Sequence, residues 1–257
     1  MRRPLFGLSV DAIVLDEAVE RCMRAVAVGP PIEVGVLNAA KIVIMRTNRA
    51  LAEAVSGADL LLADGQSVVW ASRFLREPLP ARVAGIDLFT ALLASAERED
   101  RSVYLIGATA EVLARTVAEV RRRYPRLRIA GSRHGYFTDA EAADAAAEVR
   151  ASGADLLFLG MTSPKKEIFC ARYGAATGAK VTHGVGGSFD VLAGVVRRAP
   201  RAWQVAGLEW LYRVLQEPRR LGPRYLRTNA RFIRLTLAER WRPTPVAALS
   251  SRPIGES

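Results

Sequence analysis

Two polar side chains stand directly after apolar runs, at places where a parallel strand would end. Asp64 follows the run 60–63 and precedes a glycine, and Asn38 comes just after the run 32–36. A carboxylate placed there can act as a general base, and an amide can orient hydroxyl groups. Each residue also has a simpler interpretation, because Asp and Asn commonly cap the helix that starts after a strand.

A glycine-rich turn that ends in an acid follows a third apolar run. The sequence Gly-Val-Gly-Gly-Ser-Phe-Asp occupies residues 184–190. Glycine has no Cβ and tolerates a positive φ, so a ligand can approach this backbone closely. We therefore take Gly186, Gly187 and Asp190 as candidate binding residues.

Three other side chains suit an anionic, base-containing ligand. The guanidinium of Arg82 can bind two oxygens of a diphosphate at once. Lys166 lies at the start of the predicted helix 165–173, in a strand-turn-helix segment whose backbone N–H groups can bind an anion. Its amine could add charge to the same group or face solvent. Tyr136, in His-Gly-Tyr-Phe, can stack on a nucleobase. Histidine occurs only twice, as His134 in this segment and His183 at the end of an apolar run.

The sequence predicts neither a metal site nor a cofactor. It contains no Asp-x-Asp, no His-Glu-x-x-His and no His/Cys cluster. Cys22 and Cys170 are far apart and are expected to be reduced core thiols.

The alternation of apolar runs with helical spacing predicts an α/β fold. We expect a Rossmann-like, mostly parallel sheet with helices on both faces and ligands at the carboxyl ends of the strands. The expected strands are 32–36, 60–63, 103–106, 127–130, 156–159 and 180–183. The expected helices are 39–54, 67–75, 86–97, 110–124, 139–151 and 165–173.

The charge is concentrated near the C-terminus and suggests a division of the chain. The net charge is +11, and residues 197–242 contain twelve arginines against three acidic residues. We expect an α/β core over 1–195, a basic helical appendage over 196–242 punctuated at Gly222-Pro223, and a disordered Pro/Ser-rich tail over 243–257. The positive charge of the appendage indicates an anionic partner, which could be lipid headgroups, pyrophosphate or nucleic acid.

Membrane insertion is not expected. No run of about 18 uncharged apolar residues appears, and Asp11 interrupts any signal-peptide core. The four arginines at 224, 227, 231 and 234 would instead form one stripe about 80° wide on a helix. Such a helix suits an anionic membrane surface.

The segment 184–224 resembles the C-terminal half of the WecG/TagA/CpsF glycosyltransferases. It contains the family's sequence motifs GVGGSFDVLAG, RAP, GLEWLYR and EPRR in order, and the resemblance extends over about 30–227. Upstream matches include Asp-Gly-x-x-Val-Val from Asp64, Arg-x-x-Gly-x-Asp from Arg82, and His-Gly-Tyr-Phe. In the Arg82 motif we expect Asp87 to cap the next helix.

The resemblance implies an inverting, metal-independent glycosyltransferase of cell-surface polysaccharide synthesis. Its donor would be a nucleotide sugar, with UDP expected, and its acceptor a polyprenyl-diphosphate-linked saccharide. Asp64 would be the base, Asn38 would orient hydroxyls, and Tyr136, Gly187 and Asp190 would hold the nucleoside. The diphosphate would meet basic side chains of the core and appendage: Arg82, Lys166, Arg213, Arg220 and Arg224. The resemblance places the protein in the cytoplasm, on the inner face of the cell membrane, and leaves self-association open.

Departures from the family pattern keep other functions in view. Val36 stands where the family has Thr, Thr162 replaces a glycine, and Lys166 replaces a glutamine. A protein that binds a nucleotide sugar but has altered catalysis is one alternative. A basic nucleic-acid-binding module is another, although the chain has few lysines and no nucleic-acid motif is present. We therefore expect no nucleic acid among the partners.

Overall fold

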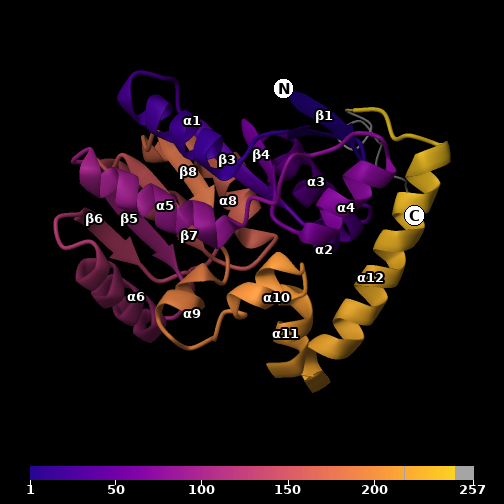
Figure 1. The fold of residues 1–257 in the computed structure, drawn as a ribbon. Coiled ribbons are helices and arrows are strands. Elements are labelled where there is room, and N and C mark those ends of the chain that lie inside the picture. The colour runs from indigo at the N-terminus through magenta and orange to yellow at the C-terminus, as the bar shows by residue number, and fades with distance from the viewer. Residues whose placement is uncertain (217, 247–257) are drawn as a thin grey trace.

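The computed structural model describes residues 1–216 and 218–246, without the side chains of residues 205, 213, 220, 221 and 224. Within this part of the chain, six parallel strands form a sheet in the order β4-β3-β8-β7-β5-β6, with helices on both faces (Figure 1). The strands are β3 (Ile32–Leu37), β4 (Leu60–Ala63), β5 (Ser102–Gly107), β6 (Arg128–Arg133), β7 (Leu156–Gly160) and β8 (Val181–Gly184). The predicted Rossmann-like α/β class is confirmed.

Two layers of helices bury the sheet. One face packs against α1 (Leu15–Ala27), α5 (Gly85–Arg98), α6 (Ala110–Arg123) and α9 (Ser188–Leu192). The other packs against α2 (Ala39–Ile44), α3 (Arg49–Ser56), α4 (Gln66–Phe74), α7 (Ala142–Ser152) and α8 (Lys165–Tyr173), with a 3₁₀ turn at Ala175–Thr177. Because both faces are covered, β4, β5 and most of β7 are continuous buried runs rather than alternating ones. Cys22 and Cys170 are buried free thiols in these layers.

Two local features differ from the predicted elements. The chain begins with an antiparallel hairpin of β1 (Arg2–Leu5) and β2 (Leu8–Asp11), whose two-residue turn uses positive φ at Phe6 and Gly7. The helix predicted over 39–54 is two helices, α2 and α3. The break occurs because the Asn48 side chain accepts a hydrogen bond from Leu51 N–H at 2.9 Å and starts a new helix.

The basic segment folds as three helices that lie against the core. They are α10 (Arg201–Val205), α11 (Glu209–Gln216) and α12 (Pro218–Trp241), and α12 runs along the outside of the molecule beside α2 (Figure 1). Phe232 of α12 is buried, with its ring centroid 5.6 Å from that of Phe6 in the hairpin turn. The second half of α12 therefore shares a core cluster with the hairpin, α2 and α4.

The expected interruption at Gly222-Pro223 is wrong, because α12 continues through it. Pro223 cannot donate a hydrogen bond to the carbonyl of residue 219, which weakens one turn near the start of the helix. The downstream half is held by its packing on the core, so the helix forms despite this loss. Among the described residues, no helix has both the length and the apolar composition that crossing a bilayer requires.

The packing of α12 on the core can be tested by comparing substitutions at two adjacent residues, one buried and one exposed. We expect Phe232→Ala to lower the free energy of unfolding by about 3 kcal/mol, because it empties a packed aromatic site. Ile233 is exposed, so Ile233→Ala should change the free energy of unfolding by less than about 0.5 kcal/mol. Urea unfolding measures both variants. Equal effects would show that α12 does not pack as described.

Candidate active site

Asp64 lies at the carboxyl end of β4 and is oriented by a backbone group from α5. The N–H groups of Asp64 and Gly65 donate to the Leu37 carbonyl at 2.9 and 3.3 Å, which turns the chain sharply after the strand. The Asp64 carboxylate then accepts a hydrogen bond on Oδ1 from Gly85 N–H at 3.0 Å. Asp64 is therefore not a cap of α4. The residue is partly exposed. The bond to Gly85 restrains the orientation of the carboxylate through Oδ1, and Oδ2 takes no part in that bond.

Asn38 lies beside this turn, at the carboxyl end of β3. Its Oδ1 accepts a hydrogen bond from Lys41 N–H at 3.0 Å, so the side chain does cap α2. A Cβ on Gly65 would come within 3.3 Å of the Asn38 Cβ. The glycine thus lets the turns after β3 and β4 pack closely. The cap uses one acceptor site of the Asn38 amide oxygen, which leaves the amide nitrogen and the second lone pair of the oxygen to contact substrate hydroxyls.

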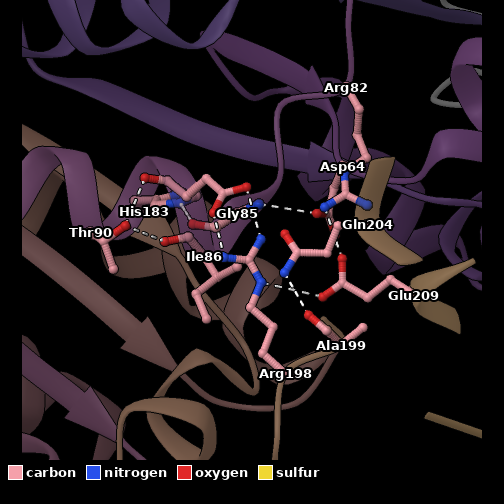
Figure 2. Close-up of polar contacts among 11 residues, drawn as sticks. Asp64, Arg82, Gly85, Ile86, Thr90, His183, Arg198, Ala199, Gln204 and Glu209 are labelled. Carbon is pink, nitrogen blue, oxygen red and sulfur yellow. Dashed lines mark hydrogen bonds and ion pairs between the residues drawn. The ribbon is translucent and has the colours of Figure 1, made fainter. Parts of the chain in front are cut away.

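An ion-pair network joins the core to the basic segment next to Asp64 (Figure 2). Arg82 Nη2 lies 2.8 Å from Glu209 Oε2 at the start of α11. Arg198 donates two hydrogen bonds to the Asp87 carboxylate, at 2.6 and 2.9 Å, and its Nε lies 3.5 Å from Glu209 Oε1. We call Arg82, Asp87, Arg198 and Glu209 the latch. It ties the start of α5 to residues more than a hundred positions later in the chain.

The latch corrects one expectation and adds residues that the sequence did not reveal. Asp87 was expected to cap the following helix. However, α5 begins at Gly85, and the Asp87 carboxylate binds Arg198 from within the first turn. Arg198 and Glu209 carry no spacing signal of their own, since their partners are distant in sequence. The only signal in the sequence that could have identified them is the pair of family motifs that contain them, RAP and GLEWLYR.

A buried cluster of charges lies behind Asn38. Lys41 Nζ is 2.7 Å and Lys166 Nζ is 2.6 Å from the Glu167 carboxylate, and all three side chains are buried. Burial alone would raise the pKa of Glu167, but the two ammonium groups outweigh it and hold that pKa at about 2. Burial, followed by the charge of Lys166, lowers the pKa of Lys41 to about 8. Lys41 also donates to the Val36 carbonyl, which braces the turn that carries Asn38.

Lys166 is therefore not a solvated surface residue. Its stem lies on Gly184, where an added Cβ would come within 3.0 Å of the Lys166 Cδ. The ammonium is engaged by Glu167 on the same helix. Contact between Lys166 and a donor diphosphate stays a prediction, and it would require the amine to share its charge with an ion pair already in place.

The side chain of Tyr136 projects from a loop after β6. The residue is 73% exposed, so the loop presents the ring to solvent rather than packing it. Lys165 fixes this loop from α8: its Nζ donates to the Gly135 carbonyl at 3.0 Å and lies 4.1 Å from the centroid of the Phe137 ring. A firmly held, exposed tyrosine is a suitable stacking surface for a base.

The glycine-rich turn follows β8 at the same edge of the sheet. The N–H groups of Val185 and Gly186 donate to the Leu159 carbonyl at 3.0 and 3.2 Å, and Gly186 has a φ of 55°. Gly187 precedes α9, and Asp190 lies within that short helix. The turn thus presents its backbone beside the loop after β7, since a Cβ on Gly186 would be 4.0 Å from the Met161 carbonyl oxygen.

The structure thus brings the candidate residues to one edge of the sheet in two groups. Asp64, Asn38 and Arg82 lie after β3 and β4, and the other group follows β6 and β8: Tyr136, Gly186, Gly187 and Asp190. The candidate side chains of Arg213, Arg220 and Arg224 lie outside the described part of the structure. In that described part, no group of three or more His, Cys, Asp or Glu residues is arranged to hold a metal ion.

The latch can be tested with a double-mutant cycle on Arg198 and Asp87. We expect a coupling energy of about 1 kcal/mol, because the pair is bidentate and partly buried. The exposed pair Glu111–Arg115 on α6 is the control and should give about 0.5 kcal/mol or less. Urea unfolding of the single and double alanine variants measures both. A coupling for Arg198 and Asp87 no larger than the control would contradict the latch.

Comparison with known protein families assigns the chain to one family. The model of the "Glycosyl transferase WecG/TagA/CpsF family" matches residues 3–245, which is nearly the whole chain. The match includes the core, the latch and α12, so one family accounts for both the sheet and the basic helices. This family of glycosyltransferases acts in cell-surface polysaccharide synthesis. The chain belongs to the WecG/TagA/CpsF glycosyltransferase family.

Proposed function

We propose that this protein is an inverting glycosyltransferase that moves a sugar from a nucleotide donor onto a polyprenyl-diphosphate-linked saccharide. The observation that carries the proposal is the Asp64 carboxylate at a strand end, held on Oδ1 by Gly85 N–H. The donor we expect is a UDP-sugar. Family membership supports glycosyl transfer in general, whereas the donor and acceptor rest on the site and on the resemblance.

Asp64 is suited to the role of general base. With Oδ1 engaged by Gly85, Oδ2 would accept the proton of the acceptor hydroxyl as that oxygen attacks the anomeric carbon. Formation of the new glycosidic bond and departure of the nucleoside diphosphate in one displacement inverts the anomeric configuration. A positioned base of this kind contributes about 10²- to 10⁴-fold to the rate. Asn38, beside it, would orient the hydroxyl groups.

The donor would lie across the carboxyl ends of the strands. Tyr136 would stack on the base, and Gly186, Gly187 and Asp190 would contact the nucleoside. Arg82 would bind the diphosphate, in exchange for or together with its ion pair to Glu209. Lys166 and the appendage arginines Arg213, Arg220 and Arg224 would add positive charge. On this proposal, cationic side chains neutralise the leaving diphosphate, and transfer needs no divalent cation.

The outer face of α12 supports contact with the inner surface of the cell membrane. Its exposed apolar residues fall in one row about 80° wide on a helix, namely Leu226, Ile233, Leu237 and Trp241. Exposed basic residues form the adjacent row, namely Arg227, Arg231 and Arg234. The opposite face of the helix is buried on the core through Phe232. An apolar row beside a cationic row suits a peripheral helix on anionic lipid.

The base is tested by Asp64→Asn, which keeps the size and removes the proton acceptor. We expect turnover to fall by about 10²- to 10⁴-fold with donor binding nearly unchanged. Asp144→Asn, an exposed carboxylate on α7, is the control. Transfer from UDP-, GDP- and dTDP-sugars to a polyprenyl-diphosphate acceptor is measured in excess EDTA, after a thermal-shift screen of the same donors.

Three results would count against this mechanism. Near-wild-type turnover of Asp64→Asn would remove Asp64 as the base. A strict requirement for Mn²⁺ or Mg²⁺ would contradict metal independence. Donor binding without transfer by the wild type would favour the alternative of a nucleotide-sugar-binding protein with altered catalysis, to which Val36 and Lys166 point.

Membrane contact is tested by changing only the outer face of α12, since truncation would expose the cluster around Phe6. Replacing Arg227, Arg231 and Arg234 with Gln should weaken binding to phosphatidylglycerol vesicles by about 100-fold, because each charge contributes on the order of 1 kcal/mol. The same change at Arg121, Arg122 and Arg123 of α6 removes equal charge elsewhere. Flotation of both triple variants with the vesicles measures the effect. An equal loss in the two variants would assign the binding to net charge alone.

A further inference from the structure

His183 is a fully buried histidine that the proposed chemistry does not use. It lies in β8 with Val34 of β3 as its register partner, and its ring is enclosed between two backbone carbonyls. Nδ1 is 3.3 Å from the Val34 oxygen. On the other side of the ring, Nε2 is 3.3 Å from the Gly85 oxygen, and Figure 2 shows His183 and Gly85 side by side. The ring edge thus joins the middle of the sheet to the first residue of α5.

Gly85 is the residue that orients Asp64. Its N–H donates to Asp64 Oδ1, while its carbonyl faces His183 Nε2, so both of its polar groups are engaged by this site. An added Cβ at Gly85 would be 3.7 Å from Val36 and 4.0 Å from His183 Nε2. The imidazole therefore contacts the carbonyl of the same residue whose N–H holds the carboxylate.

The protonation of the ring decides which carbonyl it can hold. Burial lowers the pKa of His183 to about 4, so at neutral pH the ring is uncharged and carries one N–H. It can then donate to Gly85 or to Val34, but not to both. The Val34 carbonyl belongs to a strand that is paired on both sides, whereas Gly85 is the first residue of a helix and its N–H is held by a side chain.

We propose that His183 is a positioning residue for Asp64, with Nε2–H donating to the Gly85 carbonyl and so keeping Gly85 N–H on the carboxylate. The inference rests on the proposed function only in taking Asp64 as the base. A misplacement of about 1 Å at a reacting group can cost about 100-fold in rate. Loss of this support should therefore lower the rate of the chemical step and leave donor binding largely intact.

Two substitutions separate the two ring nitrogens. His183→Gln places an amide N–H near the position of Nε2, and His183→Asn places one near Nδ1. We expect His183→Gln to keep kcat within about threefold of wild type, and His183→Asn to lower it by about 10- to 100-fold with the donor KM unchanged. Thr182→Val, a buried neighbour on the same strand, is the control and should keep kcat. Urea unfolding shows whether the variants are equally folded.

A second readout does not depend on enzyme activity. Hydrogen exchange of the Gly85 amide, followed by NMR, should be about tenfold or more faster in His183→Asn than in the wild type, His183→Gln or Thr182→Val. If the wild type transfers no sugar but this exchange pattern holds, the proposed function fails and the role of His183 stands. Unchanged Gly85 exchange in His183→Asn, or equal loss of kcat in the Gln and Asn variants, would overturn the role of His183.

Discussion

The first turn of α5 is the constraint on which the site depends. Gly85 holds the Asp64 carboxylate through its N–H and faces His183 through its carbonyl, and two residues later Asp87 binds Arg198. Three segments that are distant in the chain therefore meet at one helix start. The N–H and the carbonyl of Gly85 belong to successive peptide groups, each of them planar, so contacts to both restrain the backbone of this glycine and, through its N–H, the Asp64 carboxylate. On the proposed mechanism, a base held in this way would need little reorganisation when the acceptor arrives.

Charge is handled differently on the two sides of this turn. In the latch, partly buried arginines and carboxylates pair across the boundary between core and basic segment, so the segment is placed by directional contacts as well as by apolar packing. Behind Asn38, one carboxylate serves two lysines in the interior. Buried ions are tolerated only when paired, so this cluster makes the turn after β3 dependent on α8. The turns that carry Asn38 and Asp64 are thus flanked by charge pairs, which include Arg82 and Lys166, the two core cations proposed to meet the diphosphate.

The helix α12 of the basic segment has two faces of different character. Phe232 joins the core cluster of the hairpin and α2, so α12 is built into the fold and cannot be treated as a detachable tail. Its outer face keeps exposed apolar and basic rows, which a helix serving only the core would not require. On the proposal that the outer face meets the membrane, the inner face would hold the core close to a membrane-bound acceptor.

The sequence by itself determined the α/β class, the positions of the buried strands, and the polar residues at their carboxyl ends, including Asp64 and Asn38. These follow from local signals, because continuous apolar runs and Asp-Gly or glycine-rich turns are readable within a few residues. Only the tertiary structure decided that Lys166 is buried on Glu167, that Asp87 binds Arg198, that α12 packs through Phe232, and that His183 faces Gly85. Each of these depends on which side chains the packed helices and strands bring together and on how far burial excludes water from them. Periodicity along the chain carries no information about either.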